Sequence, residues 1–247
     1  MKRPVYQAEY AGHTVRYRFL HPGTRMLFRS WVRCVEGDAY DVSVTPERME
    51  ETRAELPDEY SDSDVEFRAL IGLTSHALLP LGCCLIHAVA FLWRGRAWLL
   101  AAPSGTGKTT QFLNWQRLHP DEITVICGDM PVLERREDGS IWVHPSPWNG
   151  KERLGDRRSP AAPLGGLVSL AQGRENEILP MPVGDAISVL FNQFLLLPDT
   201  EEEILMLTSL MDALLRAGPV WQLTNRGDDA STELLRQTWK GGGHDPL

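Results

Sequence analysis

The chain of 247 residues contains few cysteines and no excess of positive charge. Four cysteines are present, and their spacing matches no structural zinc site, so we expect free thiols. They are Cys34, Cys83, Cys84 and Cys127. Asp and Glu outnumber Lys and Arg by 33 to 25, which makes the net charge −8. A nucleic-acid surface needs a basic stripe, so this balance disfavours nucleic acid as a partner.

The sequence also lacks the marks of secretion and of membrane insertion. Residues 1–4 lead into a polar, aromatic segment instead of the apolar core of a signal peptide, so we expect a cytoplasmic protein. Residues 69–93 contain no Asp, Glu, Lys or Arg and are numerous enough to cross a bilayer. Gly72, Pro80 and His87 interrupt this run, together with other small and polar residues. We therefore expect a buried helix and then a buried strand, and no membrane partner.

What the sequence does contain is a phosphate-binding pattern at residues 97–110, AWLLAAPSGTGKTT. An apolar strand is predicted over 97–102, followed by a loop of small residues and then the first turn of a helix. Backbone N–H groups converge on a phosphate only where side chains are small, and a helix start adds free donors and a positive dipole end. The expected nucleotide-binding residues are Ser104, Gly105, Thr106, Gly107, Lys108, Thr109 and Thr110.

Within this loop, Lys108 is expected to reach the terminal phosphates and the Thr109 hydroxyl to bind Mg²⁺. The first glycine of the usual P-loop pattern is replaced by Ala102, and Pro103 follows it without an N–H group. The rest of the pattern is complete. We therefore predict that the chain binds ATP, or another nucleoside triphosphate, with Mg²⁺.

Two further residues are candidates for chemistry near the phosphates. Asp129 follows a predicted strand over 123–127, and a carboxylate there could bind Mg²⁺ or accept a proton from an attacking hydroxyl. His87 lies on the apolar run 85–93, which is predicted to form a β-hairpin with the strand before the loop. A histidine on such a strand is either a core residue or a group that contacts the γ-phosphate, and the sequence leaves both interpretations open.

The loop 145–153 is the last candidate region. It contains Trp148, Lys151, Glu152 and Arg153 between two predicted strands. Cationic groups there could neutralise a transferred phosphoryl group or bind an acidic substrate. A solvated surface loop explains the same residues equally well.

Around these residues the pattern predicts an α/β domain preceded by a small β-rich module. Strands are expected over 4–20, 27–35 and 39–44, an acidic linker over 46–64, and a capping box at Ser63 and Glu66. Helices are expected over 109–118, 183–197 and 201–217, and strands over 141–144, 164–170 and 220–223. We divide the chain into a β-rich module, residues 1–62, a P-loop domain, residues 63–240, and a flexible tail, residues 241–247.

Taken together, these features resemble the HPr kinase/phosphorylase-like family over residues 63–225. The resemblance depends on His87, the hairpin into residues 103–110, Trp115 and Gly128-Asp129. Residues 146–152, SPWNGKE, are similar to a PW-x-GKE stretch of short bacterial members, some of which phosphorylate peptide precursors. The resemblance implies a P-loop core similar to that of phosphoenolpyruvate carboxykinase, with a mixed sheet, flanking helices and a β-hairpin that leads into the P-loop. It also implies that His87, Lys108 and Asp129 surround the γ-phosphate as catalytic residues.

At two points the sequence departs from the family pattern, and these points concern the catalytic carboxylates and the substrate. Many members have paired aspartates where this chain has Asp129-Met130, and the HPr kinase signature segment has no clear counterpart, which disfavours HPr as the substrate. The expected function is an ATP- and Mg²⁺-dependent kinase for a Ser or Thr hydroxyl of a peptide or small protein, such as a peptide natural-product precursor. A kinase of a small hydroxylated metabolite and a non-catalytic nucleotide-binding sensor are the alternatives. Residues 1–60 are the expected place of substrate selection, and a homo-oligomer is compatible with all three.

Overall fold

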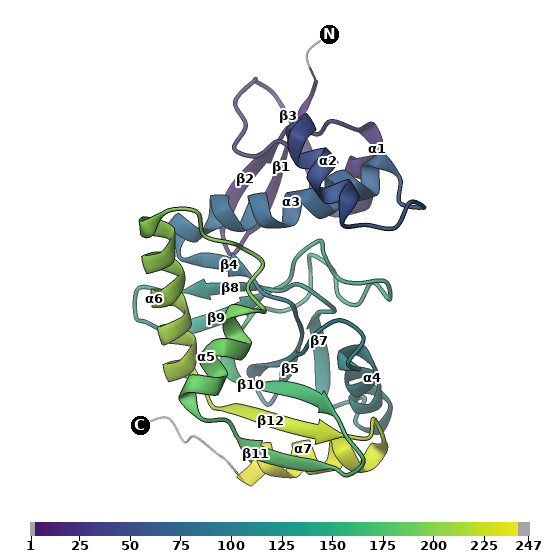
Figure 1. Cartoon of the computed structure of the whole chain (residues 1–247), viewed down its shortest axis with the longest axis vertical. Helices are drawn as coiled ribbons and strands as arrows, with labels where there is room; N and C mark the ends of the chain where they lie inside the picture. The colour runs from purple at the N-terminus through teal and green to yellow at the C-terminus, as the bar shows by residue number, and fades with distance from the viewer. Residues whose placement is uncertain (1–2, 242–247) are drawn as a thin grey trace.

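Two apolar strands lie within the large sheet of the computed structural model, which describes residues 3–241 (Figure 1). β5 (Ala88–Trp93) and β6 (Arg96–Ala101) pair antiparallel, which confirms the predicted hairpin. Their side chains alternate between two buried faces, because successive residues of a strand point to opposite sides of a sheet. Phe91 and Leu100 belong to one hydrophobic cluster, and Ala90 and Leu99 belong to another.

The surrounding sheet is large and mixed. β10 (Ala162–Gln172) is parallel to β6, β12 (Val220–Asn225) is parallel to β10, and β7 (Ile123–Cys127) is antiparallel to β5. The remaining strands are β4 (Cys83–Leu85), β8 (Val132–Arg135), β9 (Ile141–His144) and β11 (Glu177–Pro180). Within residues 3–241 the sheet has nine strands in the order β4-β8-β9-β10-β6-β5-β7, with β12 beside β10 and β11 beside β12.

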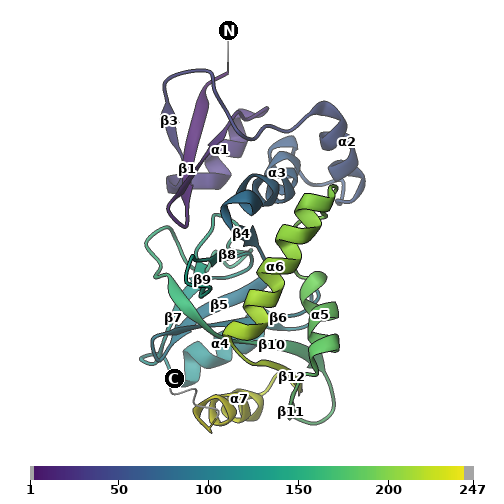
Figure 2. The same cartoon turned by 90° about the vertical axis from the view of Figure 1, so that its left-hand side faces the viewer.

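Helices cover both faces of this sheet. α4 (Lys108–Leu118) and α7 (Asp229–Gly241) pack on one face, where Trp115 and Trp239 meet Phe91. α5 (Val183–Phe191) and α6 (Glu201–Ala217) lie side by side on the other (Figure 2). Because helices cover both faces, the side chains of the central strands are buried on both sides of the sheet and are apolar. The expected α/β class with a mixed sheet and flanking helices is confirmed.

The N-terminal residues form a smaller sheet, and fewer of these residues lie in strands than the sequence predicted. β1 (Val5–Tyr10) pairs antiparallel with β2 (His13–Tyr17) and with β3 (Arg33–Val35). The predicted strand over 27–35 is wrong in its first half, because residues 22–28 form α1 (Pro22–Phe28) and a 3₁₀ turn (Arg29–Trp31) follows. Proline at the first helical position favours such a start. The strand over 39–44 is also wrong, and only an isolated bridge at Val42 is present.

The acidic segment is helical where the sequence suggested a linker. Thr45 caps α2 (Pro46–Ala54), accepting a hydrogen bond from the Arg48 N–H. α3 (Asp62–Leu78) then begins with a capping box made by Ser61 and Asp64, two residues before Ser63 and Glu66, which were expected to form it. Acidic side chains near helix N-termini are stabilised by the dipole, so this charge favours helices there.

α3 joins the small sheet to the large one, as Figure 1 shows. Glu66 on α3 is buried, and a hydrophobic cluster extends from Phe28 through Leu70 to Met130 and Trp148. This cluster contains residues from both sides of residue 62, so the N-terminal part packs closely against the rest of the chain. The domain boundary at residue 62 stays a prediction. After α3, a second 3₁₀ turn (Leu79–Leu81) leads into β4.

Other differences from the expected elements have local causes. The predicted helix over 183–197 ends at Phe191, since residues 193–195 are extended and pair with residues 85–87. That pairing also divides the predicted strand over 85–93 into β4 and β5. The helix predicted over 109–118 is confirmed and begins one residue earlier, at Lys108, and the helix over 201–217 and the strands over 123–127 and 141–144 are confirmed. Gly241 ends α7, and the rest of the predicted tail lies outside the described residues. Among the helices of residues 3–241, none is long and apolar enough to cross a bilayer.

Candidate active site

The P-loop sequence occupies the loop between the carboxyl end of β6 and the first residue of α4. Because β6 and β7 are both antiparallel to β5, the ends of β6 and β7 and the start of β5 lie at one edge of the sheet. Ala88 pairs with Ala101, and Ala90 pairs with Cys127. This edge therefore brings the loop 102–107, His87 and Asp129 together, as in other sheets that bind ligands at strand ends.

The backbone of the loop leaves donors free at the start of α4. The N–H groups of Lys108, Thr109 and Thr110 make no hydrogen bond to described residues outside the helix, and the first helical bond runs from the Gln111 N–H to the Gly107 oxygen, 2.9 Å. Gly107 has a φ of +108° and supplies no side-chain cap. Uncapped N–H groups at a helix N-terminus are suited to an anion.

The side chains of the loop leave space for a ligand. A Cβ atom on Gly105 or Gly107 would meet no heavy atom within 4 Å, so the space beside the backbone is open. Residues 104–110, which span the loop and the start of α4, have four hydroxyl groups, and none of these makes a hydrogen bond within residues 3–241. They belong to Ser104, Thr106, Thr109 and Thr110. These free donors and N–H groups fit a polyphosphate, which supports the predicted nucleotide-binding residues without testing them.

Lys108 is held against the loop. Its side chain is 7% exposed, and its Nζ donates to the Ala102 oxygen at 2.7 Å and to the Pro103 oxygen at 3.4 Å. Burial lowers the pKa of the Lys108 ammonium, and the negative charge of Asp129 acts in the opposite direction. The backbone carbonyl of residue 102, which any residue type would supply, therefore helps to hold the Lys108 ammonium at the loop.

His87 and Asp129 face each other at the same edge. His87 Nε2 lies 3.4 Å from Asp129 Oδ1, and both side chains are partly exposed, 21% and 29%. Main-chain bonds fix the two residues, since the His87 N–H donates to the Gln193 oxygen at 2.7 Å and the Ala88 N–H to the Asp129 oxygen at 2.8 Å. The three predicted catalytic residues are therefore close together.

The loop 149–155 packs against the strand end that carries Asp129. The Gly128 N–H donates to the Leu154 oxygen at 2.9 Å, and the Met130 N–H to the Trp148 oxygen at 3.0 Å. A Cβ atom on residue 128 would lie 2.6 Å from the Asn149 oxygen, closer than real Cβ contacts. Glycine at 128 is thus required for the loop to lie beside Asp129.

The side chains of this loop have different surroundings. Trp148 is 3% exposed and donates from Nε1 to the Phe67 oxygen at 3.0 Å, so it packs between the loop and α3. Lys151, Glu152 and Arg153 are exposed. The structure thus gives Trp148 a packing role, and a ligand contact by any of these four residues stays a prediction.

A cavity of about 710 Å³ lies beside Asp129. Asp129, Lys151 and Arg153 line it, together with Arg68 of α3 and Arg29, which follows α1. Sequence reasoning missed both arginines, because no local pattern indicates that residues so far apart meet at one cavity. Asp129 thus lines the cavity and also interacts electrostatically with Lys108 of the phosphate-binding loop.

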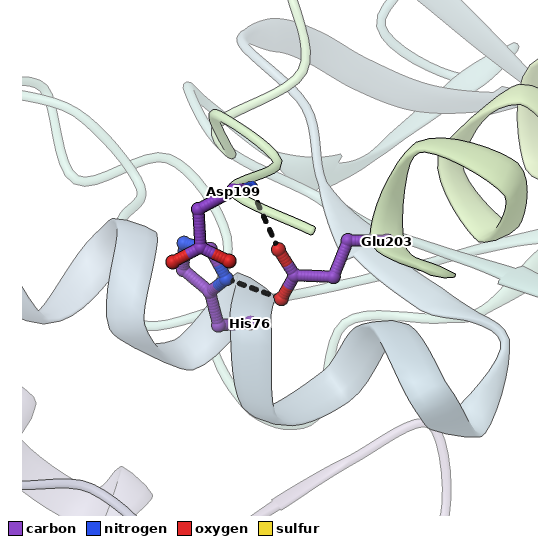
Figure 3. Close-up of side chains that lie close together, drawn as sticks. All are labelled: His76, Asp199 and Glu203. Atoms are coloured by element: carbon purple, nitrogen blue, oxygen red, sulfur yellow. Dashed lines mark hydrogen bonds and ion pairs between the residues drawn. The ribbon is translucent and has the colours of Figure 1, made fainter. Parts of the chain in front are cut away.

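Two groups of residues offer ligand atoms for a divalent cation. The Thr109 hydroxyl and the Asp129 carboxylate provide the oxygen ligands that Mg²⁺ prefers, and the free hydroxyl fits that use. Elsewhere, His76, Asp199 and Glu203 have ligand atoms within 4.8 Å of one another (Figure 3). There Glu203 accepts from His76 Nδ1 at 2.7 Å and from the Asp199 N–H at 3.0 Å. These bonds lower the pKa of Glu203 and connect α3 to α6, which accounts for the cluster structurally.

Comparison with known proteins adds little to this description. No protein-family model and no curated protein matches the chain. Among solved structures, the Hpr(Ser) kinase/phosphatase from Coxiella burnetii is similar over 53% of this chain and 97% of its own, with 11% sequence identity and a TM-score of 0.30. A likeness this weak supports no argument about activity, so the function has to be argued from the site itself.

Proposed function

We propose that this protein is an ATP- and Mg²⁺-dependent kinase that phosphorylates a Ser or Thr hydroxyl of a peptide or small protein. One observation carries the proposal. Asp129 lines a cavity that no residue of 102–110 lines, and its charge also acts on Lys108 of the phosphate-binding loop, so one carboxylate can serve both a nucleotide and an acceptor. A site that only senses a nucleotide has no need of the second cavity.

Each residue has a role that follows from its position. The N–H groups of residues 108–110 and the Lys108 ammonium hold the β- and γ-phosphates, while the Thr109 hydroxyl and Asp129 hold Mg²⁺. When bound, Mg²⁺ neutralises charge on the phosphate oxygens. Asp129 accepts the proton as the acceptor oxygen bonds to the γ-phosphorus and the bond from that phosphorus to ADP breaks. His87 contacts Asp129 Oδ1 and so orients that carboxylate.

The test is ATP consumption that depends on an added acceptor, measured with a library of serine-containing peptides. Asp129→Asn keeps the shape of the side chain and removes the base, so turnover is expected to fall by about 10²–10⁴-fold while ATP binding persists. Asp121→Asn, an exposed aspartate before β7, is the matched control and should leave turnover unchanged. Lys108→Met is expected to weaken ATP binding, with the exposed Lys240→Met as its control.

The two alternatives give different results in the same assay. A nucleotide-binding sensor binds ATP but consumes none with any peptide or metabolite, and its behaviour is the same in Asp129→Asn. A metabolite kinase consumes ATP with small hydroxylated compounds and not with peptides. Either result would contradict the proposed function.

A further inference from the structure

The cavity beside Asp129 is distinct from the phosphate-binding loop. None of residues 102–110 lines it. Its walls come from four segments that are remote in sequence, namely residues 26–31, residues 60–71, residues 129–130 and residues 147–153. Of His87, Lys108 and Asp129, the cavity is lined by Asp129, so a ligand bound there can reach that carboxylate.

Four cationic side chains line this cavity. They are Arg29, Arg68, Lys151 and Arg153. All four are exposed, and none has an ion pair or side-chain hydrogen bond with a residue in the described range 3–241. Several other arginines of the chain are paired, for example Arg136 with Glu134 and Arg236 with Glu122. In a chain with a net charge of −8, a group of unpaired cations around one cavity indicates an anionic ligand.

The two carboxylates of the cavity do not cancel this charge. Asp64 accepts hydrogen bonds from the Ser61 N–H at 3.0 Å and from the Ser61 hydroxyl, and so serves the cap of α3. Asp129 lies at the boundary of the cavity, next to His87. Two carboxylates offset only part of the charge of four cations, so the lining keeps an excess of positive charge.

Apolar side chains form the rest of the lining. Met26 is 66% exposed, and Trp31 and Phe67 are partly buried. A volume of about 710 Å³ is within the range of roughly 300–1,000 Å³ that ligand pockets usually have. The cavity therefore combines separated cations with aromatic surface, which suits a short chain that carries both carboxylates and an apolar side chain.

We infer that this cavity binds the acceptor as an acidic peptide segment. Its carboxylates pair with the four cations, and an apolar side chain packs against Trp31 and Phe67. The inference rests on the kinase activity proposed above for one point only, which is that the acceptor hydroxyl lies at Asp129. Guanidinium groups pair with carboxylates through two parallel hydrogen bonds, so arginine on two walls favours acidic side chains at more than one position.

Binding can be measured without catalysis. The probe is a fluorescein-labelled library of decapeptides with a fixed central serine, followed by fluorescence anisotropy in the absence of ATP. Peptides with Asp or Glu beside the serine are expected to bind at least about tenfold more tightly than those with Lys or Arg, and the difference should shrink as salt is added. Equal binding of acidic and basic peptides would overturn the inference.

Charge reversal localises the effect. Arg68→Glu is expected to weaken binding of the selected acidic peptide about tenfold, while Arg68→Lys keeps most of it. Arg174→Glu, in the exposed turn after β10, is the matched control and should bind as the unchanged protein does. If Arg174→Glu weakens binding as much as Arg68→Glu, the effect is one of net charge and the assignment of the cavity fails.

Competition experiments separate other ligands from peptides. A labelled single-stranded oligonucleotide that binds as tightly as the acidic peptide would overturn the inference, and so would free aspartate or citrate that competes as well as the peptide.

The kinase proposal and the proposal for the cavity are contradicted by different results. Acidic peptides that bind but are never phosphorylated contradict the kinase and support the cavity, whereas phosphorylation of another acceptor without acidic selection contradicts the cavity alone.

Discussion

The carbonyl oxygen of Asn149 lies 2.6 Å from the position that a Cβ atom on residue 128 would occupy. Gly128→Ala is therefore expected to push the loop 149–154 away from Asp129, because the new Cβ atom and the Asn149 carbonyl oxygen cannot both keep these positions. Overpacking of this kind costs about 1–3 kcal/mol, and ATP turnover should fall with it. Urea unfolding and the kinase assay measure the two effects.

Gly184→Ala provides the comparison for this substitution. Residue 184 is in the first turn of α5, and a Cβ atom there would meet no heavy atom within 4 Å. Alanine in a helix is more favourable than glycine by up to about 1 kcal/mol, so this variant should be as stable or more stable, with unchanged activity. A Gly128→Ala protein that behaves in the same way would show that the loop is free to move.

Glu66 holds the N-terminal segment to α3. Its buried carboxylate accepts the N–H groups of Leu20 and His21 at 2.5 and 2.8 Å, and the Thr24 hydroxyl at 2.6 Å. Glu66→Gln replaces one acceptor oxygen with a donor, which leaves buried N–H or O–H groups unpaired and should cost about 1–3 kcal/mol of unfolding free energy. Thermal unfolding of this variant is compared with that of Glu59→Gln, an exposed residue. Equal stabilities would contradict the assignment.

The indole of Trp148 contributes both packing and a hydrogen bond. It lies 5.4 Å from the Phe28 ring and 5.5 Å from the Phe67 ring, measured between centroids. Trp148→Ala should destabilise the fold by about 3–5 kcal/mol through the cavity it leaves, and Trp148→Phe by less. Trp221→Phe is the control, because the buried Nε1 of Trp221 has no hydrogen-bond partner among the described residues. Circular dichroism in denaturant separates the three, and a Trp148→Phe protein as stable as Trp221→Phe would argue against the Phe67 bond.

Arg236 on α7 pairs with Glu122, and this pair makes stability depend on pH. Hydrogen bonds from Arg236 and Trp93 lower the pKa of Glu122 from 4.5 to about 2. A carboxyl whose pKa is depressed by folding stabilises the folded state above its unfolded pKa, and the contribution is lost as pH falls from about 4.5 towards 2. The pair is partly exposed, so Glu122→Gln should cost only about 0.5–1 kcal/mol at pH 7.

Thermal unfolding of Glu122→Gln and of the unchanged protein, measured from pH 7 to pH 3, tests this dependence. The difference in melting temperature should be constant down to about pH 5 and narrow below it. Glu175→Gln, in the exposed turn before β11, controls for the loss of one charge. A difference in melting temperature that widens as pH falls would be opposite to the predicted pH dependence, and it would contradict a lowered pKa for Glu122.

The sequence by itself determined the elements whose patterns are local. The β5–β6 hairpin, α4 and α6 follow from apolar spacing and from the residues at their ends, as does the P-loop, because each depends on contacts within a few residues. The N-terminal helices were missed, since short segments with weak periodicity take the form that their neighbours stabilise. Glu66 illustrates this, because spacing suggested a cap and the tertiary structure uses it to bind Leu20 and His21.

What only the tertiary structure decided is how distant residues meet. Asp129 and His87 could be named from the sequence, but their 3.4 Å contact depends on the antiparallel register of β5 with β6 and β7. Arg29 and Arg68 carry no local signal, and they meet Lys151 only because α3 packs between the two sheets. Such long-range packing depends on the burial of apolar surface from the whole chain, which no short stretch of sequence specifies.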